Sequence, residues 1–307
     1  MSGGSLTRGD ALTAYRFAAN HGFAYQATNL AEYAFSAYGY SRNTLLGTAL
    51  GDAFNVTRSL NGLDLSTRGL GDPNERDWDI WFTARRTSLN GDTEGYTLDS
   101  AIGAEWRYQP STTLGFALSY GDTEQARSGI LSESRTLAYG PYIRHKYREN
   151  WDIGGFLLYG RPDFTIDGTS FRSDAFAIGV GATGAHVIGN VDVTSYLSMV
   201  GTTEGLPAIT IGGVAIAERR QTSVTGNFGA RAHFNRGQEM RPYLSLGGAF
   251  SRIDDGISDA ITHFTPTLGA GLNIETELGA LSLDLSASEI TEGTRAVSVG
   301  FTFAAQF

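Results

Sequence analysis

The stretch 297–307 constrains the fold of this chain most, because its apolar residues alternate strictly with small or polar ones. It reads Val-Ser-Val-Gly-Phe-Thr-Phe-Ala-Ala-Gln-Phe. A period of two predicts a β-strand with one apolar face and one polar face. At the open edge of a sheet in water, such a strand would promote aggregation. In a closed membrane barrel it pairs with the first strand and its apolar face contacts lipid.

The composition permits a membrane barrel and excludes other classes. No run of about 18 apolar residues occurs, so we expect no transmembrane helix. Barrel strands need only every second residue to be apolar. The 17 Phe, 14 Tyr and 4 Trp suit the aromatic girdles of such barrels. The net charge of -9, without a basic stripe, argues against nucleic-acid binding.

The period of two persists from Asp77 to the C-terminus and predicts an all-β transmembrane barrel of twelve antiparallel strands. We expect the strands at about 78–84, 98–108, 114–120, 137–147, 151–159, 176–180, 191–200, 224–234, 244–250, 264–274, 281–287 and 297–307.

The predicted connections alternate between short and long. Tight turns are expected at 109–111, 148–150, 189–190, 235–238 and 275–279, and longer polar loops at 86–95, 121–133, 161–171, 201–218 and 252–262. Outer-membrane barrels have this asymmetry, with short periplasmic turns and longer external loops. We therefore expect the loops at the cell surface and the C-terminus on the periplasmic side of a bacterial outer membrane.

Charged residues of both signs occur at positions that the alternation turns inward. Charge facing lipid is costly, so these residues predict a wet lumen or one filled by a polar plug. The predicted lumen-facing set is Asp79, Arg85, Asp99, Glu105, Arg107, Arg144, Lys146, Asp152, Arg231, Glu275 and Asp284.

Residues 1–76 have a different pattern, which we divide into 1–43 and 44–76. The first part contains stretches that favour helix and represents a passenger remnant or linker. In the second part, 44–60 has apolar residues at helical spacing and predicts a linker helix, either threaded through the pore or part of a small separate helical segment. The pore-helix residues would be Leu46, Ala49, Leu50, Ala53 and Phe54.

No catalytic, cofactor or metal site is predicted. Gly179 to Gly184 matches the letters of a dinucleotide fingerprint, but it follows no strand–helix order, so we interpret it as part of a strand. The five histidines lack metal-ligand spacing. A barrel enzyme would need side chains gathered at one rim, and the candidates there are Asp174, Asp254, Asp255, Asp259 and His263.

The C-terminal strand resembles the signal that the outer-membrane barrel assembly machinery recognises. The matching residues are Ser298, Gly300, Phe301, Phe303 and Phe307. This resemblance implies the assembly machinery as a partner during insertion, together with outer-membrane lipid and lipopolysaccharide as surroundings.

The region 77–307, with its strand count, loop alternation and terminal strand, resembles the C-terminal translocator domain of autotransporters (type V secretion). The resemblance implies an outer-membrane barrel that anchors an N-terminal passenger and translocates it to the surface, with a helix retained in the lumen. We expect a monomeric barrel and the C-terminal part of a longer precursor. The family's paired-Asn cleavage motif is missing; Asn55 and Asn61 are the nearest candidates for self-cleavage inside the barrel. The alternatives are a stand-alone porin-like channel and a barrel protease or lipase.

Overall fold

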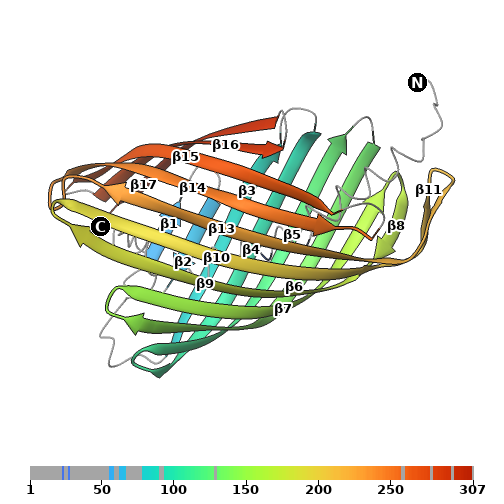
Figure 1. The fold of residues 1–307 in the computed structure, drawn as a ribbon, viewed down its shortest axis with the longest axis horizontal. Coiled ribbons are helices and arrows are strands. Elements are labelled where there is room, and N and C mark those ends of the chain that lie inside the picture. The colour runs from blue at the N-terminus through green and yellow to red at the C-terminus, as the bar shows by residue number, and fades with distance from the viewer. Residues whose placement is uncertain are drawn as a thin grey trace.

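The wall of the molecule is one long antiparallel sheet. The computed structural model describes residues 23, 27, 55–58, 62–66, 78–89, 93–127, 130–256, 260–276, 279–291 and 294–305. Twelve long strands follow one another in the sheet in chain order (Figure 1). They are β3 (Trp78–Leu89), β4 (Thr93–Gln109), β5 (Thr112–Arg127), β6 (Ile130–Arg148), β7 (Trp151–Ile166), β9 (Asp174–Ile188), β10 (Val191–Leu206), β13 (Arg219–His233), β14 (Met240–Asp254), β15 (Ile261–Thr276), β16 (Gly279–Thr291) and β17 (Thr294–Ala305). The predicted barrel strands are confirmed in number and position.

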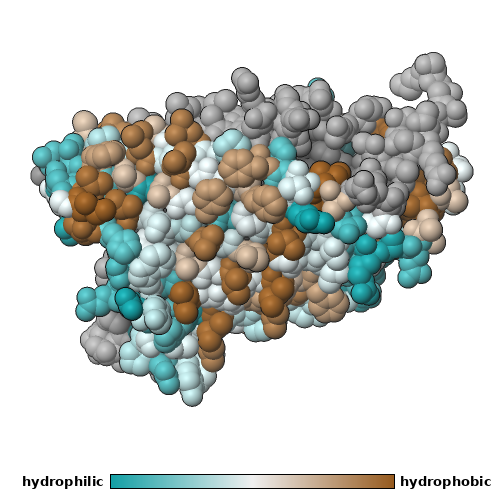
Figure 2. All heavy atoms as spheres, viewed as in Figure 1, coloured by the Kyte–Doolittle hydropathy of each residue, from teal (hydrophilic) through white to brown (hydrophobic). Residues whose placement is uncertain are grey.

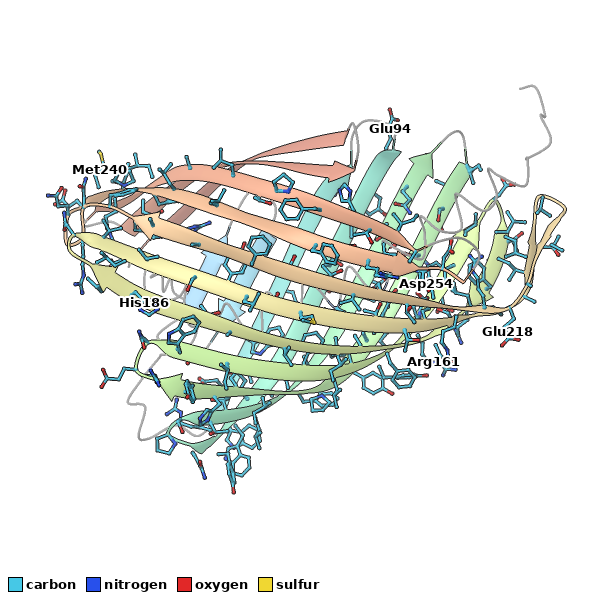
Figure 3. The ribbon with its side chains drawn as sticks, viewed as in Figure 1. Glu94, Arg161, His186, Glu218, Met240 and Asp254 are labelled. Carbon is cyan, nitrogen blue, oxygen red and sulfur yellow. The ribbon has the colours of Figure 1, made fainter. Side chains whose placement is uncertain are left out.

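One end of the wall carries tight connections and is called the tight-turn end below. The strands β4, β6, β9, β13 and β15 finish there, where the sequence predicted short turns. His186 and Met240 lie at this end, and Glu94, Glu218 and Asp254 lie at the opposite one (Figure 3).

At the opposite end, called the overhang end below, the predicted long loops are wrong, because most of their residues belong to strands. There the strands continue through most of the predicted loop sequence: β5 and β6 remain paired up to Arg127 and Ile130. Strand β6 has 19 residues, although about 9–11 suffice to cross a bilayer. In β5, for example, residues 122–125 are polar on both faces, so their composition resembles that of a loop while the backbone stays extended.

Three short strands lie at the overhang end. Strand β8 (Thr169–Arg172) folds back on the end of β7, and β11 (Ile209–Ile211) pairs with β12 (Val214–Ile216). Both hairpins turn through two residues with positive φ: 48° and 76° at Asp167 and Gly168, and 56° and 83° at Gly212 and Gly213. Two-residue turns with this twist match the twist of paired strands.

Two further strands precede the wall. Strands β1 (Asn55–Arg58) and β2 (Gly62–Ser66) form a hairpin, and β2 pairs with β3. The predicted linker helix is therefore wrong at 55–58, where Asn, Val, Thr and Arg form a strand paired with β2. Strand β1 lies beside β17, although no ladder joins the two among the described strands. In the described residues no helix is long and apolar enough to cross a membrane.

The C-terminal strand pairs with β16 as the pattern predicted. Ser298, Gly300, Phe301 and Phe303 lie opposite Ser286, Asp284, Leu283 and Leu281. Phe307 lies outside the described residues.

The wall has two faces of different chemistry. Along β6, buried and exposed residues alternate for most of its length. Large apolar side chains such as Ile102, Phe116 and Leu157 are more than half exposed on the outward face. Apolar side chains are spread over the strands in Figure 2. This is the surface that a lipid bilayer would cover.

Candidate functional site in the barrel interior

Two helical residues pack against the inner face of the wall. Phe23 and Ala27 are 1% and 0% exposed and belong to one apolar cluster with Trp81, Phe156 and Leu158. Residues four apart lie on one face of a helix, so both side chains point to the same wall. The N-terminal segment thus contributes to the core inside the barrel.

Phe23 fits here because the wall provides a glycine. A Cβ atom added to Gly160 would lie 2.4 Å from Cε2 of Phe23, closer than real contacts allow. The absence of a side chain at Gly160 therefore creates the space that the aromatic ring fills.

The described contact lies earlier in the chain than the predicted pore helix. The sequence predicted a pore helix through Leu46, Ala49, Leu50, Ala53 and Phe54, and those five residues lie outside the described residues. Phe23 and Ala27 belong to 1–43, the segment interpreted as a passenger remnant or linker. The sequence analysis missed both. The apolar spacing from Phe23 through Ala27 to Leu30, Ala31 and Ala34 was the available signal.

A buried hydrogen-bond network crosses the inner face of β3, β4 and β6. The indole Nε1 of Trp81 donates to the hydroxyl of Tyr142 at 2.7 Å, and that hydroxyl donates to Oε1 of Glu105 at 2.6 Å. Nη2 of Arg144 donates to the other carboxylate oxygen of Glu105 at 2.6 Å. Glu105 is only 1% exposed. Removing one member of such a buried pair is costly because the other charge remains desolvated.

Glycines opposite aromatic residues let these rings lie against the wall. Trp81 is paired with Gly103, and Tyr142 with Gly115. A Cβ atom at either glycine would lie 2.2–2.3 Å from the facing ring. Gly179, from the apparent dinucleotide fingerprint, faces Phe156 in the same way within β9. That motif is therefore part of a strand, as interpreted from the sequence.

The predicted lumen-facing charges occupy several environments. Asp99, Glu105 and Arg144 are buried. Arg107 lies 3.9 Å from Asp79. Asp152 and Arg231 are half-buried, and Lys146 is exposed near the tight-turn end. The side chains of Arg85, Glu275 and Asp284 lie outside the described part of the structure.

A second charged group near the tight-turn end was missed by the sequence analysis. Arg241 donates through Nη2 to Oδ2 of Asp192, and Arg236 lies 3.2 Å from the same carboxylate. Nearby, the guanidinium of Arg231 lies 4.4 Å from the ring centroid of Tyr243. These residues come from β10, β13 and β14 and the turn between the last two, so only strand pairing brings them together.

The overhang end has an apolar core of its own. Ile130, Phe164, Ile166, Leu206, Ile211 and Ile216 are all buried there. The rings of Phe164 and Phe171 stack with centroids 5.0 Å apart. The β11–β12 hairpin thus packs on the inward-facing side chains of β6 and β7. We call the hairpin, β8 and this cluster the apolar cap.

A buried acid lies beside the apolar cap. Glu204 is 4% exposed, and its carboxylate accepts a hydrogen bond from the hydroxyl of Ser173. Burial raises the pKa of Glu204 to about 7, although the Ser173 hydrogen bond acts in the opposite direction. Beyond Met199 the outward positions of β10 are Gly201, Thr203 and Gly205, so Glu204 lies past the apolar band of this strand.

The rim residues considered for an enzyme serve local structure. Asp174 accepts from the hydroxyl of Tyr159 at 2.6 Å and lies 3.3 Å from Arg161, while Asp254 accepts from the amide of Gly256 at 3.0 Å. Asp255 is buried, His263 is half-buried, and Asp259 lies outside the described residues. Within the described ranges, no three His, Asp or Glu side chains are placed to hold a metal ion.

Comparison with known proteins agrees with this architecture. The family model "Autotransporter beta-domain" matches residues 80–302. The β-domain of the Bordetella autotransporter BrkA is similar in structure, at 16% identity and a TM-score of 0.54, covering 74% of this chain and 96% of that one. The translocator domain of NalP from Neisseria meningitidis aligns over 92% of this chain and 99% of that one, at 15% identity and a TM-score of 0.49. No curated protein matches.

The family match spans most of the chain and coincides with the twelve long strands from β3 to β17. Members of this family are outer-membrane β-barrels of type V secretion, which anchor and translocate a passenger and are not an enzyme class. This chain belongs to the autotransporter β-domain family.

Proposed function

We propose that this barrel anchors and translocates an N-terminal passenger, with the segment around Phe23 and Ala27 retained in its interior. The observation that supports this is the burial of Phe23 against Gly160 on the inner wall. A chain that links a surface passenger to its barrel must pass the lumen, and a side chain that fits the wall would hold it there. No cofactor is required for this role.

In this proposal the overhang end faces the cell surface and the tight-turn end faces the periplasm. Tight periplasmic turns and larger external structures are the common arrangement of outer-membrane barrels. The C-terminus of β17 would then be periplasmic, available to the assembly machinery through Ser298, Gly300, Phe301, Phe303 and Phe307. We expect a monomeric barrel.

The porin-like alternative is less well supported. A diffusion channel needs an open polar lumen, but helical residues 23 and 27 share an apolar core with the inner wall. We propose that the barrel has no catalytic role. Self-cleavage at Asn55 or Asn61 stays a prediction; Asn55 is the first residue of β1 and pairs opposite Ser66.

A surface-display experiment tests the translocation. A protease-sensitive reporter is fused before Met1 and expressed behind a signal peptide, and intact cells are treated with protease. We expect the reporter to be cleaved while the barrel remains intact. A reporter that is cleaved only after the outer membrane is opened would contradict translocation.

A second experiment tests the retained segment. The chain has no Cys, so single cysteines at Ala27 and Ser170 can be labelled in intact cells with a bulky impermeant thiol reagent. Ser170 lies exposed on β8 and serves as the accessible control. We expect Ser170→Cys to react and Ala27→Cys to stay protected until the barrel is denatured. Equal labelling of both sites would place the segment outside the lumen.

A further inference from the structure

The outward face of β5 to β9 changes from apolar to charged in successive cross-strand rows. The first row contains Leu118, Tyr139, Tyr159 and Phe176, each directly opposite the next. Its three rings form one chain, with centroids 5.7 Å apart between the tyrosines and 4.9 Å apart between Tyr159 and Phe176. Aromatic rows of this kind mark the membrane–water interface of a barrel.

The next outward row toward the overhang end contains Tyr120, Leu137 and Arg161. Above it lies a row made only of charges: Asp122, Arg135, Asp163 and Arg172, paired in this order across four strands. We call this last row the charge ladder. Figure 3 labels Arg161 near the overhang end.

The arginines at this level are held loosely. Arg135 is 66% exposed, with Nε 3.8 Å from Asp122, and Arg161 is 57% exposed, with Nε 3.3 Å from Asp174. Exposed ion pairs contribute only about 0–1 kcal/mol, so these guanidinium groups can exchange partners at little cost. Arg172 differs, because two of its nitrogens bind Asp163 at 2.5 and 3.1 Å.

Register places the two loose arginines side by side. Arg135 lies opposite Asp163, and Arg161 precedes Asp163 by two residues on the same strand face. Diagonal neighbours of this kind have Cβ atoms roughly 7 Å apart, within the reach of long side chains. Two guanidinium groups can thus converge on a single tetrahedral anion, which suits phosphate.

We infer that Arg135 and Arg161 bind a phosphate group of an outer-leaflet phosphorylated glycolipid, whose acyl chains lie on the Leu118–Phe176 row. The ligand class follows from continuity, because the arginines stand one and two rows above the interfacial aromatics, at the level of lipid headgroups. The three aspartates at the same level, Asp122, Asp163 and Asp174, suit the divalent cations that accompany lipid phosphates. This inference rests on the proposed orientation, in which the overhang end faces outward.

The test uses the full-length barrel, folded in mild detergent and titrated with purified lipopolysaccharide in the presence of Mg²⁺. Binding is followed by native mass spectrometry and by the thermal unfolding midpoint. We expect the intact lipid to bind and raise the midpoint. In Arg135→Gln/Arg161→Gln, we expect affinity to fall at least about tenfold, because two charge-assisted contacts are lost.

A matched control removes charge elsewhere on the same face. Arg220 on β13 and Arg252 on β14 are also outward and exposed, so Arg220→Gln/Arg252→Gln should bind as the wild type does. Dephosphorylated lipopolysaccharide and inorganic phosphate should each fail to raise the midpoint.

Three outcomes would overturn the inference: unchanged affinity in the Arg135/Arg161 variant, equal loss in the control, or equal stabilisation by phosphatidylglycerol. If the double variant does not fold, Arg135→Lys/Arg161→Lys keeps the charge but loses the planar fork, and should bind with intermediate affinity. Binding in detergent is independent of passenger display, so failure here and failure of translocation can be distinguished.

Discussion

Phe23 and Gly160 are complementary across the barrel interior: the ring of one occupies the space that a side chain on the other would fill. A Cβ atom at Gly160 would lie 2.4 Å from the ring of Phe23 and 3.4 Å from Cβ of Ala138. Because Phe23 is 1% exposed, this contact joins a described residue of the N-terminal segment closely to the wall.

Gly160→Ala should release this segment. The added methyl group overlaps the ring, so Phe23 must leave its site and the segment loses its burial there. We expect a cysteine at Ala27 to become reactive to thiol reagents in the Gly160→Ala background. Gly201→Ala is the control, because its Cβ would meet its nearest atom at an ordinary 3.7 Å. Protection that persists in Gly160→Ala would mean that the contact does not hold the segment.

Glu105→Leu should destabilise the barrel strongly. It leaves Arg144 without its carboxylate in a buried site and removes the acceptor of the Tyr142 hydroxyl. We expect a loss of about 3–5 kcal/mol in unfolding free energy, measured by denaturant titration in detergent. Glu105→Leu/Arg144→Met, which removes both charges, should recover part of this loss. No recovery in the double variant would show that packing, rather than the orphaned charge, explains the effect.

The apolar cap should lose stability as pH rises. Below pH 4.5 Glu204 is protonated in both the folded and unfolded states; between 4.5 and about 7 it ionises in the unfolded chain while burial keeps it neutral in the fold. Stability contributed by the neutral acid is therefore fully present below pH 4.5 and lost toward pH 7. The resulting decrease in the free energy of unfolding between pH 4.5 and neutral or higher pH is about 3 kcal/mol at most.

Proteolysis of the β11–β12 hairpin at pH 5 and pH 8 measures this effect. We expect faster cleavage at pH 8 in the wild type and a much smaller difference in Glu204→Gln, which stays neutral. If the pH dependence of cleavage is unchanged in Glu204→Gln, a group other than Glu204 causes it.

Ile102→Arg should impair the barrel in the membrane. Ile102 is 52% exposed on the outward face, between Phe82 and Leu118 on the neighbouring strands. Arginine facing lipid is unfavourable, by up to about 2–4 kcal/mol at the bilayer midplane and by less toward the interfaces. Thr222→Arg, on the overhang part of β13, should be nearly neutral. Folding into lipid vesicles, compared between the two variants, checks the predicted position of the bilayer.

The wall was predictable because its signal is local. Alternation at Ile102, Phe116 and Leu157 fixes both the strand and its outward face without knowledge of any partner. The extension of β5 escaped prediction because it is polar on both faces, as inward Thr123 and outward Glu124 show, so the period of two no longer separates apolar from polar residues. Residues 55–58 were assigned to a helix from a window of small and apolar residues, but they form a strand because they pair with β2 in a hairpin.

For the interior, the sequence predicted which residues face the lumen but not the contacts that they make. The alternation along the strands identified Glu105 and Arg144 as lumen-facing residues. It did not identify their link through Tyr142 to Trp81, because that depends on which strands are neighbours and on the glycines opposite both rings. The contribution of Phe23 depends on Gly160, which lies far away in the sequence.

Because β6 is long, the rim from which an exported chain would be released lies well above the membrane surface. The 19 residues of β6 exceed the crossing requirement by about eight, which at roughly 3.3 Å per residue and a tilt of about 40° raises the rim some 20 Å above the lipid. In the proposed orientation, a polypeptide leaving this raised rim would enter solvent well away from the lipid headgroups.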